Sequence, residues 1–296
     1  MKTLVTGALQ ATEEELKRLG ELGLDIVFHR NERDAVAEPE QFEAVICNGL
    51  FLYNDIEKFT SLRYIQLTSA GTDRVPMEYI REHGIELKNA AGVYAVPMAE
   101  WTLMRLLELY KNAGRLFENR GWEKDRSWRE LAGKTACIVG FGAYGAEVAR
   151  RLKAFDVRVC AVNRSAKGSP FVDEFYTMDR LDEALGKADI VILAIALTDE
   201  TEHLMNAERF AAMRDGAVFL NAARGALVDE AALIEALKNK LSGAALDVFE
   251  VEPLPDTSPL HRLDNLLISP HNSFVGEGNH ERLMDVVMRN QNIRRN

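Results

Sequence analysis

Residues 134–165 read KTACIVGFGAYGAEVARRLKAFDVRVCAVNRS, and this stretch decides the fold. The apolar residues 135–139 predict a buried strand, and residues 157–162 predict a second one. Between them, residues 146–155 carry apolar side chains at a spacing that suits a helix packed on a sheet. A strand–helix–strand unit of about 30 residues predicts a parallel sheet with helices on its faces.

Three glycines, Gly140, Gly142 and Gly145, occupy the loop between the first strand and the helix in GxGxxG spacing. In a dinucleotide site the first glycine permits a tight turn, the second lets a pyrophosphate approach the backbone, and the third lets the helix pack closely on the strand. The helix N-terminus adds partial positive charge for the phosphates. GxGxxG alone is also typical of an ordinary glycine-rich turn, but the flanking strands and helix favour a dinucleotide site.

The residue expected at the ribose of the dinucleotide is Asn163, 18 residues beyond Gly145 and followed by Arg164 and Ser165. An Asp or Glu here would bond the ribose 2′-OH of NAD and repel a 2′-phosphate, whereas Asn, Arg and Ser can bond that phosphate. We therefore expect NADP(H) to be preferred, with NAD(H) possible. The alternative is that Arg164 stacks on the adenine and Asn163 accepts either cofactor.

The composition is typical of a globular protein of about two domains, with 296 residues, 47% of them hydrophobic. A net charge of −10 argues against nucleic acid or an anionic membrane surface as a partner. No apolar run approaches the roughly 18 residues that span a bilayer, and the N-terminal apolar stretch is too short for a signal peptide. The three cysteines fall in predicted strands and are interpreted as buried thiols, so we expect a cytoplasmic protein. No histidine pair has metal-ligand spacing, so no metal site is expected.

The first ninety residues alternate short strands and helices, which predicts a second parallel sheet. A helix is expected over residues 12–22, with Thr12 as N-cap and Glu15 at the capping-box position. A long helix over residues 97–117 is apolar on more than one side, which is typical of a helix buried between domains or against a second subunit. After it, Trp122 and Trp128 favour a docked arm over a solvated linker.

Six strands are expected from residue 134 onward, and polar side chains follow the later ones. The expected strands are residues 135–139, 157–162, 189–195, 217–221, 243–248 and 266–268. Because ligands bind beyond the carboxyl ends of parallel strands, Arg224, Asp247, Glu252 and His271 should converge at one sheet edge.

These residue types suit hydride transfer to a carbonyl group, which leaves negative charge on oxygen. A histidine can supply the proton, and a carboxylate beside it fixes its tautomer and favours the imidazolium form. A guanidinium can hold a substrate carboxylate and polarise the carbonyl. Taken singly, each residue has an ordinary explanation as a surface charge, a turn or an exposed histidine, but four in succession at one edge favour a site.

At these residues the sequence resembles the D-isomer-specific 2-hydroxyacid dehydrogenases. The matching segments are LTSAGTDRVP (67–76), NAAGVYAVPMAEWTL (89–103), ELAGKTACIVGFGAYG (130–145), NAARGALVDEAALIEAL (221–237), GAALDVFEVEPLP (243–255) and LLISPH (266–271). The resemblance implies that Arg224 binds the substrate, that His271 is the acid/base and that Glu252 is its carboxylate partner. It also implies that Asp247 binds the nicotinamide carboxamide and that the amides of Ala70 and Gly71 hold the substrate carboxylate. Further cofactor contacts are implied for the backbone at Ala143, Tyr144, Ala196, Ala222 and Ala223 and for the Thr201 side chain.

The resemblance implies an α/β architecture in which a Rossmann cofactor-binding domain, residues 92–271, is inserted into a smaller flavodoxin-like substrate domain, residues 1–91 and 272–296. It also implies a homodimer, formed through the 97–117 helix and the tryptophan arm, and an interdomain hinge there. The small-molecule partner would be a 2-oxo acid or a D-2-hydroxy acid. A dinucleotide-sensing corepressor of the same fold is the alternative. Phe274 is bulkier than the family's usual residue, and residues 50–53 either pack in the core or form an apolar substrate wall, so the substrate is left open.

Overall fold

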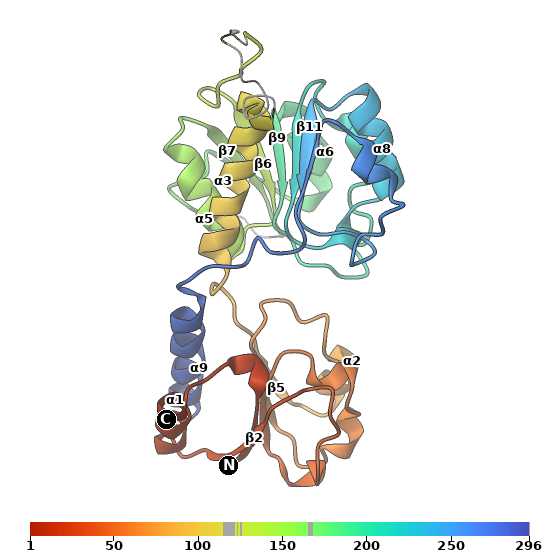
Figure 1. Ribbon diagram of the computed structural model, residues 1–296. Coiled ribbons are helices and arrows are strands. Elements are labelled where there is room, and N and C mark those ends of the chain that lie inside the picture. Colours follow the sequence, from red (N-terminus) through yellow and green to blue (C-terminus); the bar gives the residue numbers. More distant parts are fainter. Residues whose placement is uncertain (115–121, 123, 125, 165–167, 296) are drawn as a thin grey trace. The chain divides into compact units, whose positions relative to one another are not determined.

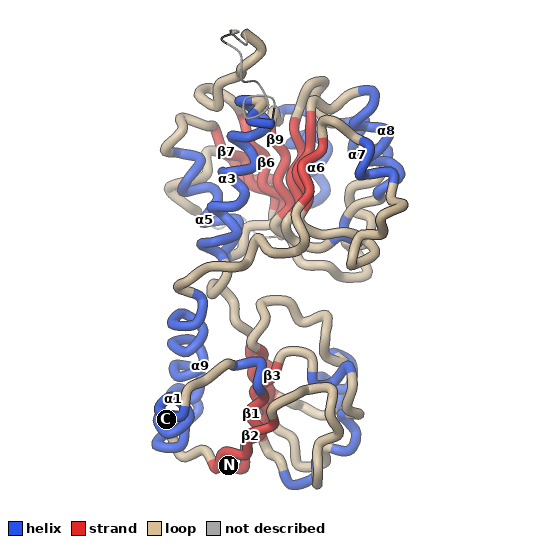
Figure 2. The backbone as a smooth tube through the Cα atoms, viewed as in Figure 1, coloured by secondary structure: helices blue, strands red, loops and turns tan. Residues whose placement is uncertain are grey.

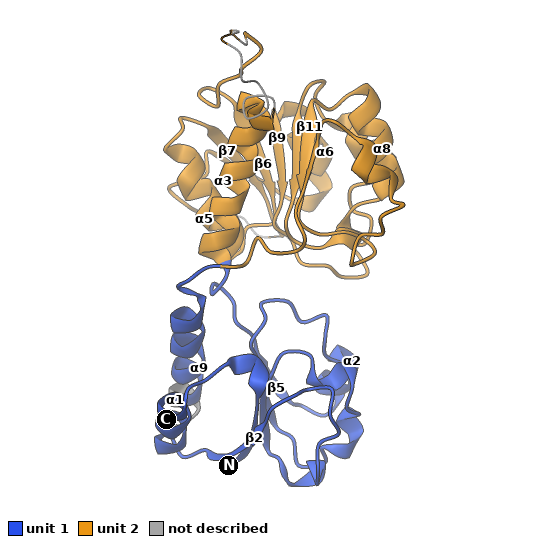
Figure 3. Cartoon of the chain, in the orientation of Figure 1, with its two compact units in different colours: residues 1–94, 276–296 blue, residues 95–275 orange. Residues whose placement is uncertain are grey.

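The computed structural model describes residues 1–114, 122, 124, 126–164 and 168–295, and it divides into two compact units (Figure 3). Unit 1 comprises residues 1–94 and 276–296, and unit 2 comprises residues 95–275. The sequence predicts the two domain boundaries after residues 91 and 271, a few residues before those of the compact units. Among the described residues, no helix combines the length and the hydropathy that crossing a bilayer requires.

Unit 1 is a five-stranded parallel sheet with helices on both faces (Figure 1). Its elements are β1 (Lys2–Thr6), α1 (Glu13–Glu21), β2 (Asp25–His29), β3 (Ala44–Cys47), β4 (Tyr64–Leu67), α2 (Met77–Glu82), β5 (Glu86–Lys88) and α9 (Asn279–Arg295). The strand order β2-β1-β3-β4-β5 is the flavodoxin-like order, which confirms that part of the fold prediction.

Local sequence accounts for the elements of unit 1. The predicted capping box is present at the start of α1, where the Thr12 hydroxyl accepts from the Glu15 amide and the Glu15 carboxylate accepts from the Thr12 amide. The buried strands place alternate side chains on opposite faces. Val45 packs in the core beneath α2, whereas Ile46 packs with the apolar face of α1 and α9.

Unit 2 is a seven-stranded parallel sheet with the order β12-β11-β10-β9-β6-β7-β8 (Figure 2). Its elements are α3 (Ala95–Lys111), β6 (Thr135–Val139), α5 (Ala143–Lys153), β7 (Arg158–Val162), β8 (Glu174–Tyr176), α6 (Leu181–Lys187), β9 (Ile190–Leu193), α7 (Ala207–Ala212), β10 (Val218–Asn221), α8 (Glu230–Asn239), β11 (Gly243–Leu246) and β12 (Leu266–Ile268). The order reverses between β6 and β9, as in a Rossmann fold, and the glycine loop follows β6 at this reversal.

Both faces of the unit 2 sheet are covered. Ala136 and Ile138 of β6 pack with α3 and α5, while Cys137 and Val139 of the same strand pack with α6, α7 and α8. Such two-sided burial explains why the strands of a parallel sheet are almost entirely apolar. The six strands expected here are all present, and the short strand β8 was not expected.

The long helix α3 is buried along most of its length, although Met104 is 46% exposed. It runs from Ala95 to Lys111, so the expected end at residue 117 is wrong. Asn112 ends the helix, because its φ of +51° is left-handed. Trp122 is 98% exposed and Trp128 is 45% exposed, so the first of these docks on no part of the described chain.

Candidate active site

The glycine loop has the backbone geometry that its sequence predicts. Gly140 has a φ of +96°, and a Cβ atom there would lie 2.4 Å from the Ala194 carbonyl oxygen. A Cβ atom on Gly145 would lie 2.6 Å from the Gly140 carbonyl oxygen and 3.2 Å from Ile138 Cγ2. Gly140 therefore permits the turn, and Gly145 permits the close approach of α5 to β6.

Gly142, by contrast, faces open space, since a Cβ atom there would meet nothing within 4 Å. It is the N-cap of α5, whose first turn presents the amides of Ala143, Tyr144 and Gly145, and no side chain caps it among the described residues. The Tyr144 hydroxyl is turned inward to Thr102 Oγ1, 2.7 Å away, and burial raises the pKa of Tyr144. A loop with backbone donors and room beside them fits the pyrophosphate of a dinucleotide.

The expected ribose residues follow β7. Asn163 is half-buried and its backbone N–H donates to the Tyr176 carbonyl oxygen at 3.0 Å, while Arg164 is exposed. Ser165 lies outside the described residues.

The turn after β9 is held together by hydrogen bonds between its own residues. Thr201 is 8% exposed, and its hydroxyl donates to the Ala196 carbonyl oxygen at 2.8 Å and accepts from the Thr198 amide at 2.8 Å. The side chain expected to line the cofactor therefore holds this turn together. Ala196 is exposed, so its backbone remains accessible.

The turn after β10 carries Arg224 and is held by Asn221, which is fully buried. Asn221 Nδ2 donates to the Arg224 carbonyl oxygen at 2.8 Å, and its Oδ1 accepts from the Ala223 amide at 3.0 Å. Arg224 Nη1 donates to the Ala223 carbonyl oxygen at 2.8 Å, and Ala222 is 3% exposed. The sequence pattern did not single out Asn221, although an Asn at the end of an apolar strand is a signal for such a turn.

His271 and Glu252 meet in the structure, as their placement after neighbouring strands predicted. His271 Nδ1 lies 2.7 Å from Glu252 Oε2, and Glu252 Oε1 accepts from the Phe249 amide at 3.0 Å. An ionised carboxylate only accepts, so Nδ1 carries the hydrogen and Nε2 is the atom left to exchange a proton with a ligand. The two side chains are 33% and 35% exposed, so a small molecule can reach the imidazole.

Asp247 is fully buried at the end of β11, and its carboxylate is occupied by neighbouring groups. It accepts from the Ser269 hydroxyl at 2.5 Å, from the Asn272 amide at 3.0 Å and from the Ser273 amide at 2.8 Å. These contacts fasten the turn around His271. The expected contact of Asp247 with a nicotinamide carboxamide stays a prediction.

In unit 2, the turns that carry Arg224, Glu252 and His271 follow the carboxyl ends of three adjacent strands, β10, β11 and β12. This edge provides a guanidinium at Arg224 and an imidazole paired with a carboxylate at His271. Within the described part of the chain, no group of three His, Cys, Asp or Glu side chains could hold a metal ion.

In unit 1, Ala70 and Gly71 lie in the turn after β4. Ser69 Oγ donates to the Gly71 carbonyl oxygen at 2.9 Å, and Asn89 Nδ2 donates to the Ala70 carbonyl oxygen at 2.6 Å. Within the described ranges of the chain, the amides of Ala70 and Gly71 donate to no protein acceptor. The two carbonyl groups are held in place and the two backbone N–H groups have no protein acceptor among the residues that the structure describes, so this turn can bind an anion.

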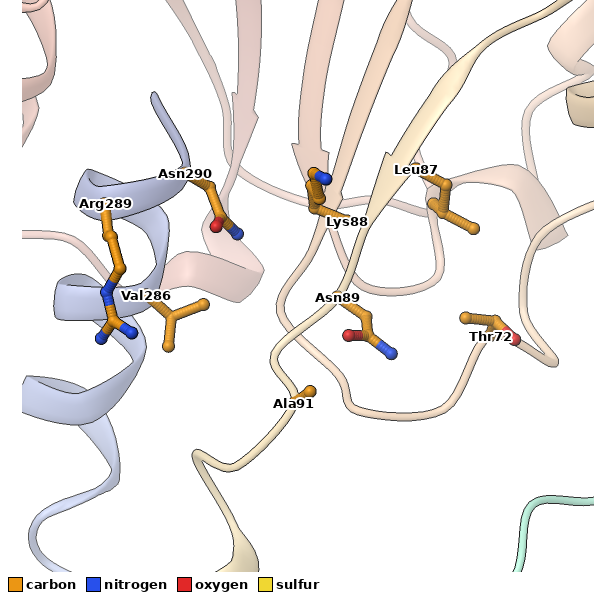
Figure 4. Close-up of a pocket in the computed structure, with 8 residues that line it drawn as sticks. All are labelled: Thr72, Leu87, Lys88, Asn89, Ala91, Val286, Arg289 and Asn290. Atoms are coloured by element: carbon orange, nitrogen blue, oxygen red, sulfur yellow. The ribbon is translucent and has the colours of Figure 1, made fainter. Parts of the chain in front are cut away.

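Unit 1 also has a cavity of about 370 Å³ between the end of β5 and α9 (Figure 4). It is lined by Thr72, Leu87, Lys88, Asn89, Ala91, Val286, Arg289 and Asn290. Two of its polar side chains have partners within the unit: Asn290 Nδ2 donates to Gln66 Oε1 at 2.8 Å, and Lys88 Nζ lies 3.4 Å from Glu86 Oε1.

The family model described as "D-isomer specific 2-hydroxyacid dehydrogenase, NAD binding domain" matches residues 101–273. The chain belongs to the D-isomer specific 2-hydroxyacid dehydrogenase family. The glyoxylate reductase of Thermofilum pendens is 35% identical over 243 residues, which are 78% of this chain and 71% of that protein. As a member of this family, the chain is an NAD(P)-dependent oxidoreductase of 2-oxo and 2-hydroxy acids.

Solved structures of other 2-hydroxyacid dehydrogenases share the architecture. One from Xanthobacter autotrophicus Py2, in complex with NADPH and MES, is 28% identical with a TM-score of 0.80, covering 98% of this chain and 95% of that one. A D-lactate dehydrogenase from Aquifex aeolicus, complexed with NAD and lactic acid, is 25% identical with a TM-score of 0.78, covering 97% of this chain and 93% of that one. Similar 2-hydroxyacid dehydrogenases thus bind either cofactor.

Proposed function

We propose that this 2-hydroxyacid dehydrogenase reduces a 2-oxo acid to the D-2-hydroxy acid, with NADPH preferred over NADH. The observation that carries the proposal is the 2.7 Å pair of His271 Nδ1 and Glu252 Oε2 at the sheet edge that also holds Arg224. When bound, the nicotinamide cofactor supplies the hydride for the carbonyl carbon.

Each residue has one part in the proposed reaction. Arg224 holds the substrate carboxylate and polarises the adjacent carbonyl, because a guanidinium matches a planar anion. His271 gives the proton on Nε2 to the carbonyl oxygen as negative charge develops there. Glu252 keeps Nδ1 protonated and compensates the charge of the imidazolium. In the oxidation direction, Nε2 takes the proton back.

The turns and the glycine loop provide for binding. The amides of the first turn of α5, with Gly140, Gly142 and Gly145, would hold the pyrophosphate, and the backbone at residues 196, 222 and 223 would line the cofactor. In unit 1, the unengaged amides of Ala70 and Gly71 suit a substrate carboxylate.

The NADPH preference rests on Asn163 and Arg164, which put an amide and a cation where an NAD-specific site has a carboxylate. We expect Asn163→Asp to shift the ratio of kcat/KM for NADPH and NADH toward NADH. Arg164→Ala should weaken NADPH binding and leave NADH binding nearly unchanged. A clear preference of the unmodified protein for NADH would refute this part of the proposal.

Two classes of 2-oxo acid are candidate substrates: those with larger, apolar side chains, and glyoxylate or hydroxypyruvate. Leu50 is buried in unit 1, whereas Leu52 and Tyr53 are 58% and 54% exposed, so the second half of this segment offers an apolar surface. This surface favours 2-oxo acids with apolar side chains over glyoxylate or hydroxypyruvate. Leu52→Ser should then shift selectivity toward the smaller, more polar acids.

A panel of 2-oxo acids with NADPH and NADH, followed at the nicotinamide absorbance, tests the proposal. Turnover of at least one acid is the expected result. Cofactor binding with no turnover of any acid would instead favour a dinucleotide-sensing, corepressor-like protein of the same fold.

We also propose a cytoplasmic homodimer. Met104 on α3, together with Trp122 and Trp128 after it, exposes large apolar side chains that a second subunit would cover. The three cysteines are buried free thiols, which suits a reducing compartment. Light scattering coupled to size-exclusion chromatography should give twice the mass of the chain, and Trp122→Glu should lower it.

A further inference from the structure

We propose that Trp101 and Ser269 are positioning residues for His271. They orient the buried carboxylate of Asp247, and this carboxylate fixes the turn that carries the imidazole. The inference rests on the proposed function, because it takes His271 to be the residue that exchanges the proton.

The first step is a chain of two hydrogen bonds from α3 to the end of β11. Trp101 Nε1 donates to Ser269 Oγ at 3.0 Å, and Ser269 Oγ donates to Asp247 Oδ1 at 2.5 Å. An indole N–H only donates and a carboxylate only accepts, so the direction of both bonds is determined. The three residues are 7%, 5% and 0% exposed, so water does not compete for these groups.

The second step runs from the carboxylate to the turn. Asp247 Oδ1 also accepts from the Asn272 amide at 3.0 Å, and Oδ2 accepts from the Ser273 amide at 2.8 Å. The His271 amide donates to the carbonyl oxygen of Asp247 at 2.8 Å. One residue therefore holds three consecutive amides, starting with that of His271.

His271 needs this support because its backbone is strained. Its φ is +50°, a left-handed conformation that a residue with a side chain adopts only when its surroundings impose it. The imidazole itself is tied to the protein through Glu252, and both of those side chains are partly exposed. Asp247 therefore fixes the backbone from which the ring extends, while Glu252 holds the ring itself.

Loss of the Ser269 hydroxyl should loosen this anchor. The buried carboxylate would keep its two amide donors and lose its shortest contact, and a buried charge left short of a donor rearranges its surroundings. Catalytic geometry is sensitive to displacements of about 1 Å, so the effect should appear in kcat rather than in binding.

The test compares Ser269→Ala, Ser269→Thr and Trp101→Phe in the full-length protein with the best 2-oxo acid and NADPH. Ser269→Ala should lower kcat about 10-fold, as expected for loss of one hydrogen bond to a charged group, while KM and the Kd for NADPH change less than about 2-fold. Ser269→Thr keeps the hydroxyl and should restore most of kcat. Trp101→Phe should lower kcat by about 3-fold, because the Ser269 hydroxyl remains but is no longer oriented.

Ser242→Ala is the control at the other end of the same strand. Ser242 lies just before the opposite end of β11, where its hydroxyl donates to the Gly216 carbonyl oxygen at 2.7 Å. This variant also removes one serine hydroxyl next to β11, and it should leave kcat unchanged.

A spectroscopic readout separates failure of this inference from failure of the proposed function. The ¹H–¹⁵N signal of His271 Nδ1–H should be sharp in the unmodified protein and in Ser242→Ala, and broadened by exchange in Ser269→Ala. Turnover of no 2-oxo acid by the unmodified protein would refute the proposed function and leave this signal to decide the inference. Full kcat in Ser269→Ala with an unchanged His271 signal would overturn the positioning role. A loss confined to NADPH affinity would overturn it as well, because Asp247 would then act on the cofactor.

Discussion

Substituting alanine at two glycines of one loop should separate folding from cofactor binding. At Gly140 the backbone has a φ of +96° and a Cβ atom would lie 2.4 Å from the Ala194 carbonyl oxygen. At Gly142 the backbone is extended, with φ −89° and ψ −162°, and a Cβ atom would meet nothing within 4 Å. A methyl group at residue 140 therefore clashes with the protein's own backbone, whereas the protein leaves room for one at residue 142.

The magnitudes follow from these contacts. Gly140→Ala combines a strained φ, about 1–3 kcal/mol, with a clash against backbone that must move, so we expect a loss of about 3–5 kcal/mol in the free energy of unfolding. Gly142→Ala replaces glycine at an N-cap, which costs at most about 1 kcal/mol. Its methyl group would occupy the space proposed for the pyrophosphate, so NADPH affinity should fall at least about 10-fold, or about 1.4 kcal/mol.

Urea unfolding measures the first effect, and a fluorescence titration with NADPH measures the second. We expect Gly140→Ala to be poorly stable, and Gly142→Ala to be nearly as stable as the unmodified protein but weak in NADPH binding. Unchanged NADPH affinity in Gly142→Ala would refute the proposal that this loop holds the pyrophosphate. Full stability in Gly140→Ala would refute the geometric reason given for its glycine.

Two further predictions concern stability. Gly225→Ala should prevent folding or cost more than about 4 kcal/mol in urea unfolding, because a Cβ atom there would lie 1.9 Å from the carbonyl carbon of Phe249; full stability would contradict the close approach of these two turns. The ammonium of Lys153 lowers the pKa of Asp173 from its ordinary value of 3.8, so this carboxylate stabilises the fold above that pH and the contribution is lost as pH falls through the lower, folded-state value. Asp173→Asn should therefore flatten the fall in the free energy of unfolding below about pH 4. The change should be no more than about 1 kcal/mol, because the side chain is 37% exposed, and an unchanged acid profile in urea unfolding would contradict it.

Most of the fold could be predicted from apolar runs, because a strand buried on both faces leaves a continuous signature in the sequence. Strand β8 was missed for the opposite reason. Its residues Glu174–Tyr176 form a short edge strand, with a salt bridge from Arg158 to Glu174 at 3.2 Å. Nothing in three such residues distinguishes an edge strand from a loop.

The site was predictable at the level of elements and less so at the level of contacts. Topology alone brought His271 and Glu252 to one sheet edge, and their 2.7 Å contact agrees with that placement. The partners of Asp247 could not be foreseen, because Ser269 is held by Trp101, which is 168 residues away along the chain. Such a contact depends on how a helix packs against a sheet, which spacing in the sequence does not encode.

Single-turnover NADPH oxidation by His271→Ala, with the best 2-oxo acid of the panel, tests the central claim most directly. The account predicts NADPH binding close to that of the unmodified protein, because the glycine loop is untouched. It predicts a rate of nicotinamide oxidation that is lower by about 10²–10⁴-fold, as expected for loss of a general acid. A His271→Ala protein that oxidises NADPH at nearly the full rate would contradict the account.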